Sequence, residues 1–192
     1  MDTVKILGIA GSLREGSYNR ATLRAARELL PANVQLESFE RLGEIPPFNE
    51  DEEGTLPDAV AQLKQQIREA DAILFVTPEY NYSIPGVLKN AIDWASRPYG
   101  ENAWDGKPVA IMGASISALG TARAQYHLRQ AFVFLNMHPV NGPEVMIPSA
   151  YERFDDQGNL TDNTSRDLIR QQLESLVEWT NQLKAGSRVL VN

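Results

Sequence analysis

The sequence predicts an α/β fold in which a parallel sheet has helices on both of its faces. Apolar, β-branched runs alternate with segments of helical period about five times along the 192 residues, which is typical of repeated strand–helix–strand units. Three of the runs, "VKILGIA", "AILFVT" and "KPVAIMGAS", are almost continuously apolar, as strands are when both sheet faces are covered. Together these observations predict a doubly wound, three-layer sandwich.

The first half of the chain contains three expected strands and two expected helices. The first helix would turn an apolar side toward the sheet, made of Ala21, Leu23, Ala25, Ala26 and Leu29 or Leu30. The strand after it alternates apolar and polar residues, as a strand near a sheet edge does. In order, the expected elements are a buried strand at 4–10, a helix at 17–30, an alternating strand at 34–40, a helix from Pro57 to about Ala70 and a buried strand at 72–77.

The second half repeats the alternation and closes on an amphipathic helix. Pro85 and Pro98 stand near the start and at the end of its first helix, where prolines are tolerated. In order, the expected elements are a helix at 83–98, a buried strand at 107–115, a helix at roughly 119–135, a fifth strand within 137–147 and an exterior helix at 162–183. We expect residues 1–185 to form a single domain and residues 186–192 to be a loosely held tail.

Composition excludes several classes of function. Lys and Arg number 18 and Asp and Glu 25, a net charge of −7 that makes nucleic acid and anionic membranes poor partners. The chain has no cysteine, which excludes disulfides, thiolate nucleophiles and cysteine-rich zinc sites. Its two histidines, His127 and His138, are too few for a histidine metal cluster, and we expect no metal site. No apolar run approaches the roughly 20 residues that cross a bilayer, so we expect a cytoplasmic protein.

The strand order decides where a ligand would bind. Five strands fit the flavodoxin-like order 2-1-3-4-5 better than a six-stranded dinucleotide-binding sheet. In such sheets ligands bind beyond the carboxyl ends of the strands, at the point where the strand order reverses. The candidate site therefore consists of the loops that follow the strands at 4–10, 72–77 and 107–115.

The first of these loops, "GSLREGSYNR", offers donors for a phosphate. Gly11 and Gly16 have P-loop spacing, but Ser17 and Tyr18 replace the lysine and the hydroxyl residue that bind a nucleoside triphosphate and Mg²⁺. A single terminal phosphate fits better, held by amide groups at the helix N-terminus and by side chains. Those side chains are Ser12, Arg14, Ser17, Asn19 and, less strongly, Arg20. Taken alone, the loop is equally well interpreted as an N-capping turn in which Ser17 bonds helix N–H groups.

The other two loops could hold a planar ring. In "TPEYNYSIPG", residues 77–86, two tyrosines, Tyr80 and Tyr82, could flank the ring while Asn81 and nearby N–H groups bond its polar edge. The alternative, docking on the protein's own surface, is plausible for one of the tyrosines. The third loop, residues 113–125, has small residues that would let a ligand approach the backbone or would serve a tight turn: Gly113, Ala114, Ser115 and Gly120.

These loops resemble those of the NADPH-dependent FMN reductase family, the flavodoxin-like quinone, azo and chromate reductases. The resemblance covers about residues 3–145, through "GSLREGSYNR", "PEYNYSIPGVLKNAIDWASRP" and "GASISALGTARAQYHLRQ". It implies bound FMN, with NAD(P)H as co-substrate. It also implies a phosphate site of Ser12, Arg14, Ser17 and Asn19, a ring site of Pro78, Glu79, Tyr80, Asn81 and Ser83, and a third-loop contribution from Ser115 and Gly120.

Two features depart from the family pattern. Glu15 stands where such loops often carry a basic residue, and an acid beside a phosphate weakens its binding. Ile116 and Ser117 replace the proline or glycine often found in the third loop. The first departure bears on cofactor affinity and on preference for NADPH, and the second on which third-loop residue contacts the flavin.

The implied activity is electron transfer from NAD(P)H through FMN to quinones or similar small acceptors, such as azo, nitro and chromate compounds, with ping-pong kinetics. Because the flavin would carry the chemistry, no catalytic acid, base or nucleophile is expected, and Tyr82 is a candidate gate of the open flavin face. Two alternatives are a flavodoxin-like electron carrier without NAD(P)H activity and a nucleotide- or phosphosugar-binding protein without redox activity. Arg14 favours the reductase, since flavodoxins usually have a hydroxyl-rich phosphate loop without arginine.

The helix from Pro85 to Arg97 is the expected surface for self-association. It holds more apolar residues than one sheet contact needs, although core packing explains most of them: Val87, Leu88, Ala91, Ile92, Trp94 and Ala95. Related proteins are dimers or tetramers, so the resemblance implies a homo-oligomer.

Overall fold

A parallel sheet in the order β2-β1-β3-β4-β5 forms the centre of the computed structural model, which describes the backbone of residues 3–189 and the side chains of residues 3–186. Its principal strands are β1 (Val4–Ala10), β2 (Val34–Ser38), β3 (Ala72–Val76) and β4 (Pro108–Ala114). All of them pair in parallel. The predicted flavodoxin-like order is confirmed, and β2 lies at the sheet edge, as its alternating pattern indicated.

The fifth strand is interrupted. β5 (His138–Pro139) pairs with the start of β4, and β6 (Val145–Ile147) pairs with the end of β4. After β5 the Val140 N–H still donates to the Val109 carbonyl over 2.8 Å, but Pro143, between the two short strands, has no backbone N–H group to donate to the ladder. The predicted strand within 137–147 is therefore present at the expected position, but it consists of two short strands and not of one.

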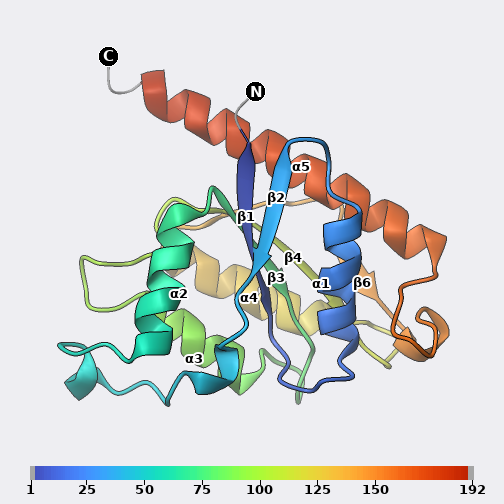
Figure 1. The fold of residues 1–192 in the computed structure, drawn as a ribbon, viewed down its shortest axis with the longest axis horizontal. Helices are drawn as coiled ribbons and strands as arrows, with labels where there is room; N and C mark the ends of the chain where they lie inside the picture. The colour runs from blue at the N-terminus through green and yellow to red at the C-terminus, as the bar shows by residue number, and fades with distance from the viewer. Residues whose placement is uncertain (1–2, 190–192) are drawn as a thin grey trace.

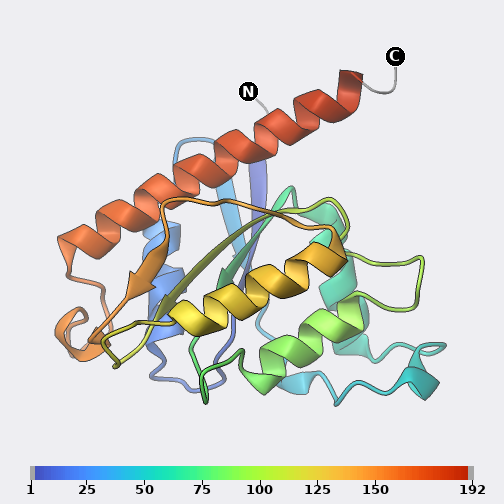
Figure 2. The same cartoon turned by 180° about the vertical axis from the view of Figure 1, so that it is seen from behind.

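Helices cover both faces of the sheet, and Figure 1 shows α1 and α2 on opposite sides of it. One face carries α1 (Tyr18–Glu28) and α5 (Asn163–Val189), and the other carries α2 (Asp58–Glu69), α3 (Gly86–Ala95) and α4 (Ala122–Leu135). Strand residues alternate between the two layers: Val4 and Ile6 pack with α1 and α5, whereas Leu7 and Ile9 pack with α2 and α3. In Figure 2 α3 and α4 lie side by side.

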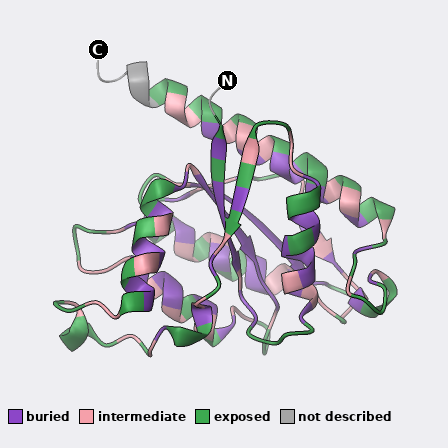
Figure 3. Ribbon diagram, in the orientation of Figure 1, coloured by how far each residue is buried: buried purple, intermediate pink, exposed green. Residues whose placement is uncertain are grey.

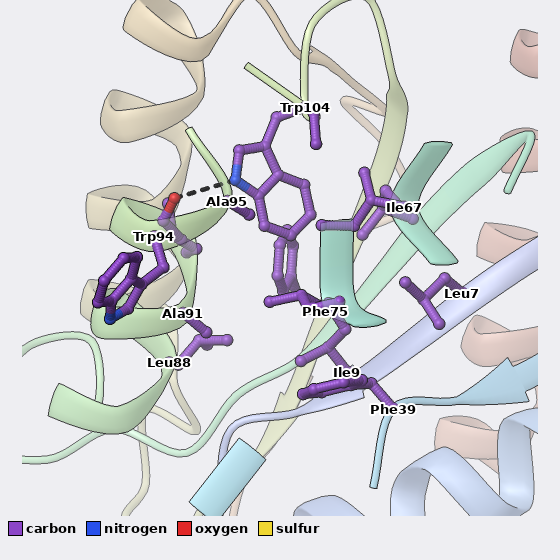
Figure 4. Close-up of a cluster of buried hydrophobic side chains, with 14 of the residues drawn as sticks. Leu7, Ile9, Phe39, Ile67, Phe75, Leu88, Ala91, Trp94, Ala95 and Trp104 are labelled. Carbon is purple, nitrogen blue, oxygen red and sulfur yellow. Dashed lines mark hydrogen bonds between the residues drawn. The ribbon is translucent and has the colours of Figure 1, made fainter. Parts of the chain in front are cut away.

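The core is densest where the segment between α3 and β4 folds back onto the sheet. Trp94 and Trp104 are fully buried, and the Trp104 indole N–H donates to the Ile92 carbonyl over 3.0 Å (Figure 4). The Phe75 ring lies 5.6 Å from that of Trp104, within the range of favourable aromatic pairs. Figure 3 shows burial across the whole molecule: the strands are mostly buried, and the helices are exposed on their outer sides.

The expected self-association surface of α3 is mostly core. Five of its six apolar residues are buried, and only Val87 is partly exposed: the buried residues are Leu88, Ala91, Ile92, Trp94 and Ala95. The neighbouring helix α4 has exposed apolar side chains, among them Val133 and Phe134, which are 81% and 79% exposed. Core packing, the alternative for α3, is thus the correct interpretation of those five residues.

The last helix is longer than predicted. It extends to Val189, so residues 186–189 continue α5, whereas the sequence predicted a tail from residue 186. The stretch contains no proline, and a single glycine, Gly186, weakens a helix without ending it. Residues 190–192 of the predicted tail lie outside the described residues. Within the described part of the chain, no helix is both long and apolar enough to cross a membrane.

Candidate functional site

Three loops meet at the carboxyl edge of the sheet, which faces the lower side of the molecule in Figure 1. They follow β1, β3 and β4 and span residues 11–17, 77–85 and 115–121. Strands β2 and β3 lie on opposite sides of β1, so the chain order reverses between β1 and β3. In open α/β sheets this reversal leaves the crevice in which ligands bind.

Ser17 is the N-cap of α1. Its Oγ accepts hydrogen bonds from the backbone N–H groups of Asn19 (3.2 Å) and Arg20 (3.4 Å). The N-capping interpretation of this residue is therefore correct. It does not exclude a phosphate, because a serine hydroxyl that accepts two bonds still has its own O–H to donate.

Ser12 and Arg14 are the other polar groups of the first loop. Ser12 is 6% exposed, and its Oγ lies 3.5 Å from the Tyr80 hydroxyl, so the first two loops touch here. The exposed Arg14 guanidinium donates to the Gly16 carbonyl over 2.8 Å, and no carboxylate among the described residues pairs with it. Arg20, by contrast, is paired with Glu40 at 3.3 Å. Arg14 is thus the free cation of this loop.

Asn19 uses its side chain inside the protein, and its predicted contact with the phosphate stays a prediction. Its side-chain amide donates to the Ala114 carbonyl over 2.9 Å, and its Oδ1 accepts from the Ala114 N–H over 2.8 Å. Both polar ends of the side chain are therefore used inside the protein, where the residue is 3% exposed. Asn19 joins the start of α1 to the end of β4.

The second loop is a tight hairpin turn. Tyr80 and Ser83 exchange two backbone hydrogen bonds of 3.1 and 3.0 Å, and the residues between them, Asn81 and Tyr82, have φ angles of 49° and 67°. Two successive positive φ angles define a type I′ turn. The turn leaves Tyr80 50% and Tyr82 68% exposed, beside the first loop and available to a flat ligand.

The Glu79 side chain supports this turn by binding the start of α4. Its side chain is 5% exposed and accepts from the backbone N–H groups of Arg123 (3.0 Å) and Ala124 (3.2 Å), at the start of α4. The Arg123 guanidinium also pairs with this carboxylate, and that hydrogen bond raises the pKa of Arg123. The Glu79 side chain thus holds the turn to α4, and the predicted place of Glu79 at the ring stays a prediction.

Arg123 also fixes one of the two tyrosines. Its guanidinium lies over the Tyr82 ring, 3.5 Å from the ring centroid, a favourable cation–π contact. The sequence left open whether one tyrosine packs on the protein's own surface, and Tyr82 does so. Tyr80, next to Ser12, is the tyrosine that faces the first loop.

His127 is a site residue that the sequence did not predict. Its Nδ1 shares a 2.9 Å hydrogen bond with the Ser83 hydroxyl. The residue follows Arg123 by one helical turn, so both side chains leave α4 on the same side. That spacing was the available signal, but it carries meaning only once the second loop is known to pack against α4.

The third loop uses its small residues for packing. A Cβ on Gly113 would lie 2.3 Å from the Thr77 carbonyl oxygen, and a Cβ on Gly120, where φ is +59°, would lie 3.1 Å from the backbone of Met146. Both glycines are therefore required by the protein itself, and close approach of a ligand does not explain them. Ser115 is half-buried and bonds the hydroxyl and N–H of Ser117.

The site thus combines an anion-binding end with a ring-binding end. The first is the α1 N-terminus with Ser12, Arg14 and Ser17, whose donors fit a phosphate monoester. The second is the Tyr80 turn, in which the N–H groups of Asn81 and Tyr82 have no partner among the described residues and can donate to a polar ring edge. Asn19, Glu79 and Gly120 lie behind these surfaces. The arrangement fits FMN.

Comparison with known proteins decides the family. A family model described as NADPH-dependent FMN reductase matches residues 4–152. The chain belongs to this family. An NAD(P)H-dependent FMN reductase of Pseudomonas aeruginosa is 56% identical, over 95% of this chain and 98% of the relative. A 2-hydroxy-1,4-benzoquinone reductase of a Burkholderia species is 41% identical, over 92% and 96% of the two chains.

A solved structure of this family supports the fold. FerB, a flavoenzyme NAD(P)H:(acceptor) oxidoreductase from Paracoccus denitrificans, has a TM-score of 0.86 and 33% identity to this chain. The match covers 94% of this chain and 98% of FerB. The family resemblance seen in the three loops is therefore confirmed over nearly the full length of the FMN reductase described here.

Proposed function

We propose that this FMN reductase passes electrons from NAD(P)H through bound FMN to quinones or similar small acceptors, including azo, nitro and chromate compounds. The observation that carries the proposal is the contact between the two ends of the site, where buried Ser12 meets the exposed Tyr80 beside the free Arg14. This contact supports a phosphate site next to a ring site. The chemistry named for the relatives supports the choice of quinones as acceptors.

Different residues would hold the phosphate and the ring of the cofactor. Arg14 would pair with the phosphate dianion, while the Ser12 and Ser17 hydroxyls and the first N–H groups of α1 donate to its oxygens. The ring would lie at the carboxyl ends of β3 and β4, next to Pro78, Tyr80, Asn81, Ser83 and Ser115. The free N–H groups of the turn are suited to stabilise negative charge on a ring edge.

When bound, FMN would supply the redox chemistry, the transfer of two electrons from the nicotinamide to the acceptor. The protein's part is to fix the ring, to exclude water from one face and to leave the other face open. No acid or base of the chain is assigned to the reaction. A gating role for Tyr82 requires that its ring leave the Arg123 guanidinium.

Absorbance and turnover of the purified protein test this function. We expect a yellow protein, or one that binds added FMN, whose absorbance is bleached by NAD(P)H and restored by a quinone. Initial rates at several concentrations of both substrates should give parallel double-reciprocal lines, as ping-pong kinetics require. A protein that binds FMN but is not bleached would be an electron carrier, and one that never binds FMN would refute the proposal.

We also propose that the protein is a homo-oligomer that associates through α3 and α4. Tyr126, Val133 and Phe134 of α4 are all more than half exposed. Beside them, a groove of about 430 Å³ between the two helices is lined by Ile92 and Phe134. Exposed apolar side chains of this size are typical of interaction sites.

Sedimentation tests the association. We expect a dimer or tetramer, and we expect Phe134→Asp to shift the distribution toward smaller species. A stable 21.3 kDa species in the native protein would contradict the proposal. A cytoplasmic location is part of the same proposal, and cell fractionation with antibodies to the protein tests it.

A further inference from the structure

A second cavity borders the candidate site on the side of β2. It has a volume of about 430 Å³ and lies between α1, the carboxyl end of β2 and residues 39–44; Figure 1 shows these elements next to one another. Ser12 and Leu13 of the first loop form part of its wall. The cavity is thus separated from the Tyr80 turn only by the first loop. Its volume falls within the usual range of small-molecule sites.

The charge of the cavity is positive although the chain carries a net charge of −7. Three arginines of α1 line it, Arg20, Arg24 and Arg27, at a spacing that places them on one side of the helix. Two glutamates also line it, but each already has a partner: Glu40 pairs with Arg20 at 3.3 Å and Glu44 pairs with Arg41 at 2.7 Å.

Arg24 and Arg27 are left without a carboxylate among the described residues. Arg24 donates to the Gly158 carbonyl over 3.3 Å, and Arg27 donates to the Ser38 hydroxyl over 2.7 Å. Each bond uses one of the five donors of a guanidinium. Two cations with spare donors beside one cavity therefore attract an anion, and a guanidinium suits a phosphate especially well.

Apolar side chains form another part of the cavity wall. Leu23, Phe39 and Leu42 line it and are buried in the protein. A ligand that fits must combine an apolar, preferably flat, body with a phosphate group. The adenosine half of NADPH has this composition, and its 2′-phosphate is the only group that distinguishes NADPH from NADH.

We propose that the arginine cavity binds the 2′-phosphoadenosine half of NADPH, with Arg24 and Arg27 at the 2′-phosphate, while the nicotinamide half reaches the Tyr80 turn across the first loop. The proposal rests on the proposed function, since it assumes that the open ring face accepts a nicotinamide. It assigns preference for NADPH over NADH to these two arginines. The sequence shows no motif for this cavity, because its arginines lie on one side of α1 and its wall comes from three separate segments of the chain.

Steady-state kinetics of Arg27→Ala and Arg24→Ala in the FMN-loaded protein test the proposal. We expect KM for NADPH to rise about tenfold or more for each variant, as loss of a charge-assisted phosphate contact does. KM for NADH and kcat for both nucleotides should stay within about twofold. Arg170→Ala is the matched control, since Arg170 lies on α5 and pairs with Asp167, and it should change neither KM.

Glu40→Gln should change KM for NADPH in the opposite direction. The variant removes the charge that pairs with Arg20, so KM for NADPH should fall while KM for NADH does not. Thermal unfolding of Arg27→Ala and Glu40→Gln should match that of the native protein. Arg27→Ala is the safer of the two arginine variants, because Arg27 bonds only the Ser38 side chain, whereas Arg24 holds the loop at Gly158.

Direct binding provides a readout that does not depend on turnover. By calorimetry the FMN-loaded protein should bind 2′,5′-ADP at least tenfold more tightly than 5′-AMP, and the two arginine variants should lose this difference. Equal binding of the two nucleotides, equal changes in KM for NADPH and NADH, or competition by inorganic phosphate at the same concentration as 2′,5′-ADP would overturn the proposal. Failure of the proposed function has a different signature, namely absence of FMN binding or of turnover with either nucleotide in the native protein.

Discussion

The first and second loops of the site lie side by side but are built in opposite ways. The first keeps its strongest charge free, since Arg14 bonds only a neighbouring carbonyl. The second is fixed from several directions: two backbone bonds close the Tyr80 turn, Glu79 binds the start of α4 and His127 bonds Ser83. The difference indicates that the first loop supplies affinity for an anion, whereas the second supplies a rigid surface.

This comparison separates two kinds of mutational effect. Substitutions in the support of the second loop should lower the stability of the fold, because buried groups lose their partners. Substitutions of exposed charges in the first loop should change ligand affinity and leave the fold intact.

The largest effect is expected for Glu79→Ala. The variant leaves two N–H groups of α4 and the Arg123 guanidinium without their carboxylate, so the free energy of unfolding should fall by about 2–4 kcal/mol. Urea denaturation measures this loss. Glu37→Ala, at an exposed position of β2, is the control and should lower stability by less than about 0.5 kcal/mol. A similar loss in both variants would mean that Glu79 does not support the turn.

Arg14→Ala is expected to have the next largest effect, on FMN affinity. Loss of a hydrogen bond to a charged phosphate should raise the Kd for FMN about tenfold to a hundredfold, with the unfolding midpoint of the cofactor-free protein unchanged. Quenching of flavin fluorescence measures the Kd. Arg20→Ala is the comparison within the same segment, and it should change FMN affinity far less because Arg20 already pairs with Glu40. Equal losses in the two variants would contradict the assignment.

A smaller effect is expected for Ser83→Ala. The variant loses the hydrogen bond to His127, which should cost about 0.5–1.5 kcal/mol of stability. His127→Ala should cost a similar amount, and the double variant should cost little more than either single variant, since both remove the same bond. Strictly additive losses in urea denaturation would show that the two side chains do not act together.

The smallest effect is expected for Glu15→Gln. Removing an acid near a bound phosphate should tighten FMN binding by about 0.3–1 kcal/mol at low ionic strength, and the gain should shrink as salt is added. Flavin titrations at two salt concentrations measure it. No change at either concentration would mean that Glu15 points its charge away from the phosphate.

Much of the fold was predictable because it is a matter of local pattern. Continuous apolar runs gave β1, β3 and β4, and the strand count gave the order of the sheet. The break in the fifth strand was harder to predict, since it depends on which end of β4 each segment pairs with. The end of α5 was missed because the helix continues past Gly186, beyond the last strongly amphipathic turn.

The loops of the candidate site were predictable from the sequence, whereas the partners of its buried polar side chains were not. Arg14, Ser12 and Tyr80 lie where the loop motifs placed them. Asn19 and Glu79 were assigned to the ligand, but their partners are 95 and 44 residues away in the chain. A motif identifies a position that requires a polar residue. It does not show whether the hydrogen-bond partner of that residue is a ligand or a distant backbone group.

The Asn19 side chain bonds both backbone groups of Ala114, and this has a consequence for how the site fills. Because one amide links the start of α1 to the end of β4, the spacing between the first loop and the third loop is set before any ligand arrives. The cofactor would then bind to a preorganised site. Hydrogen exchange should slow on FMN binding in the loops themselves and remain unchanged at Ala114.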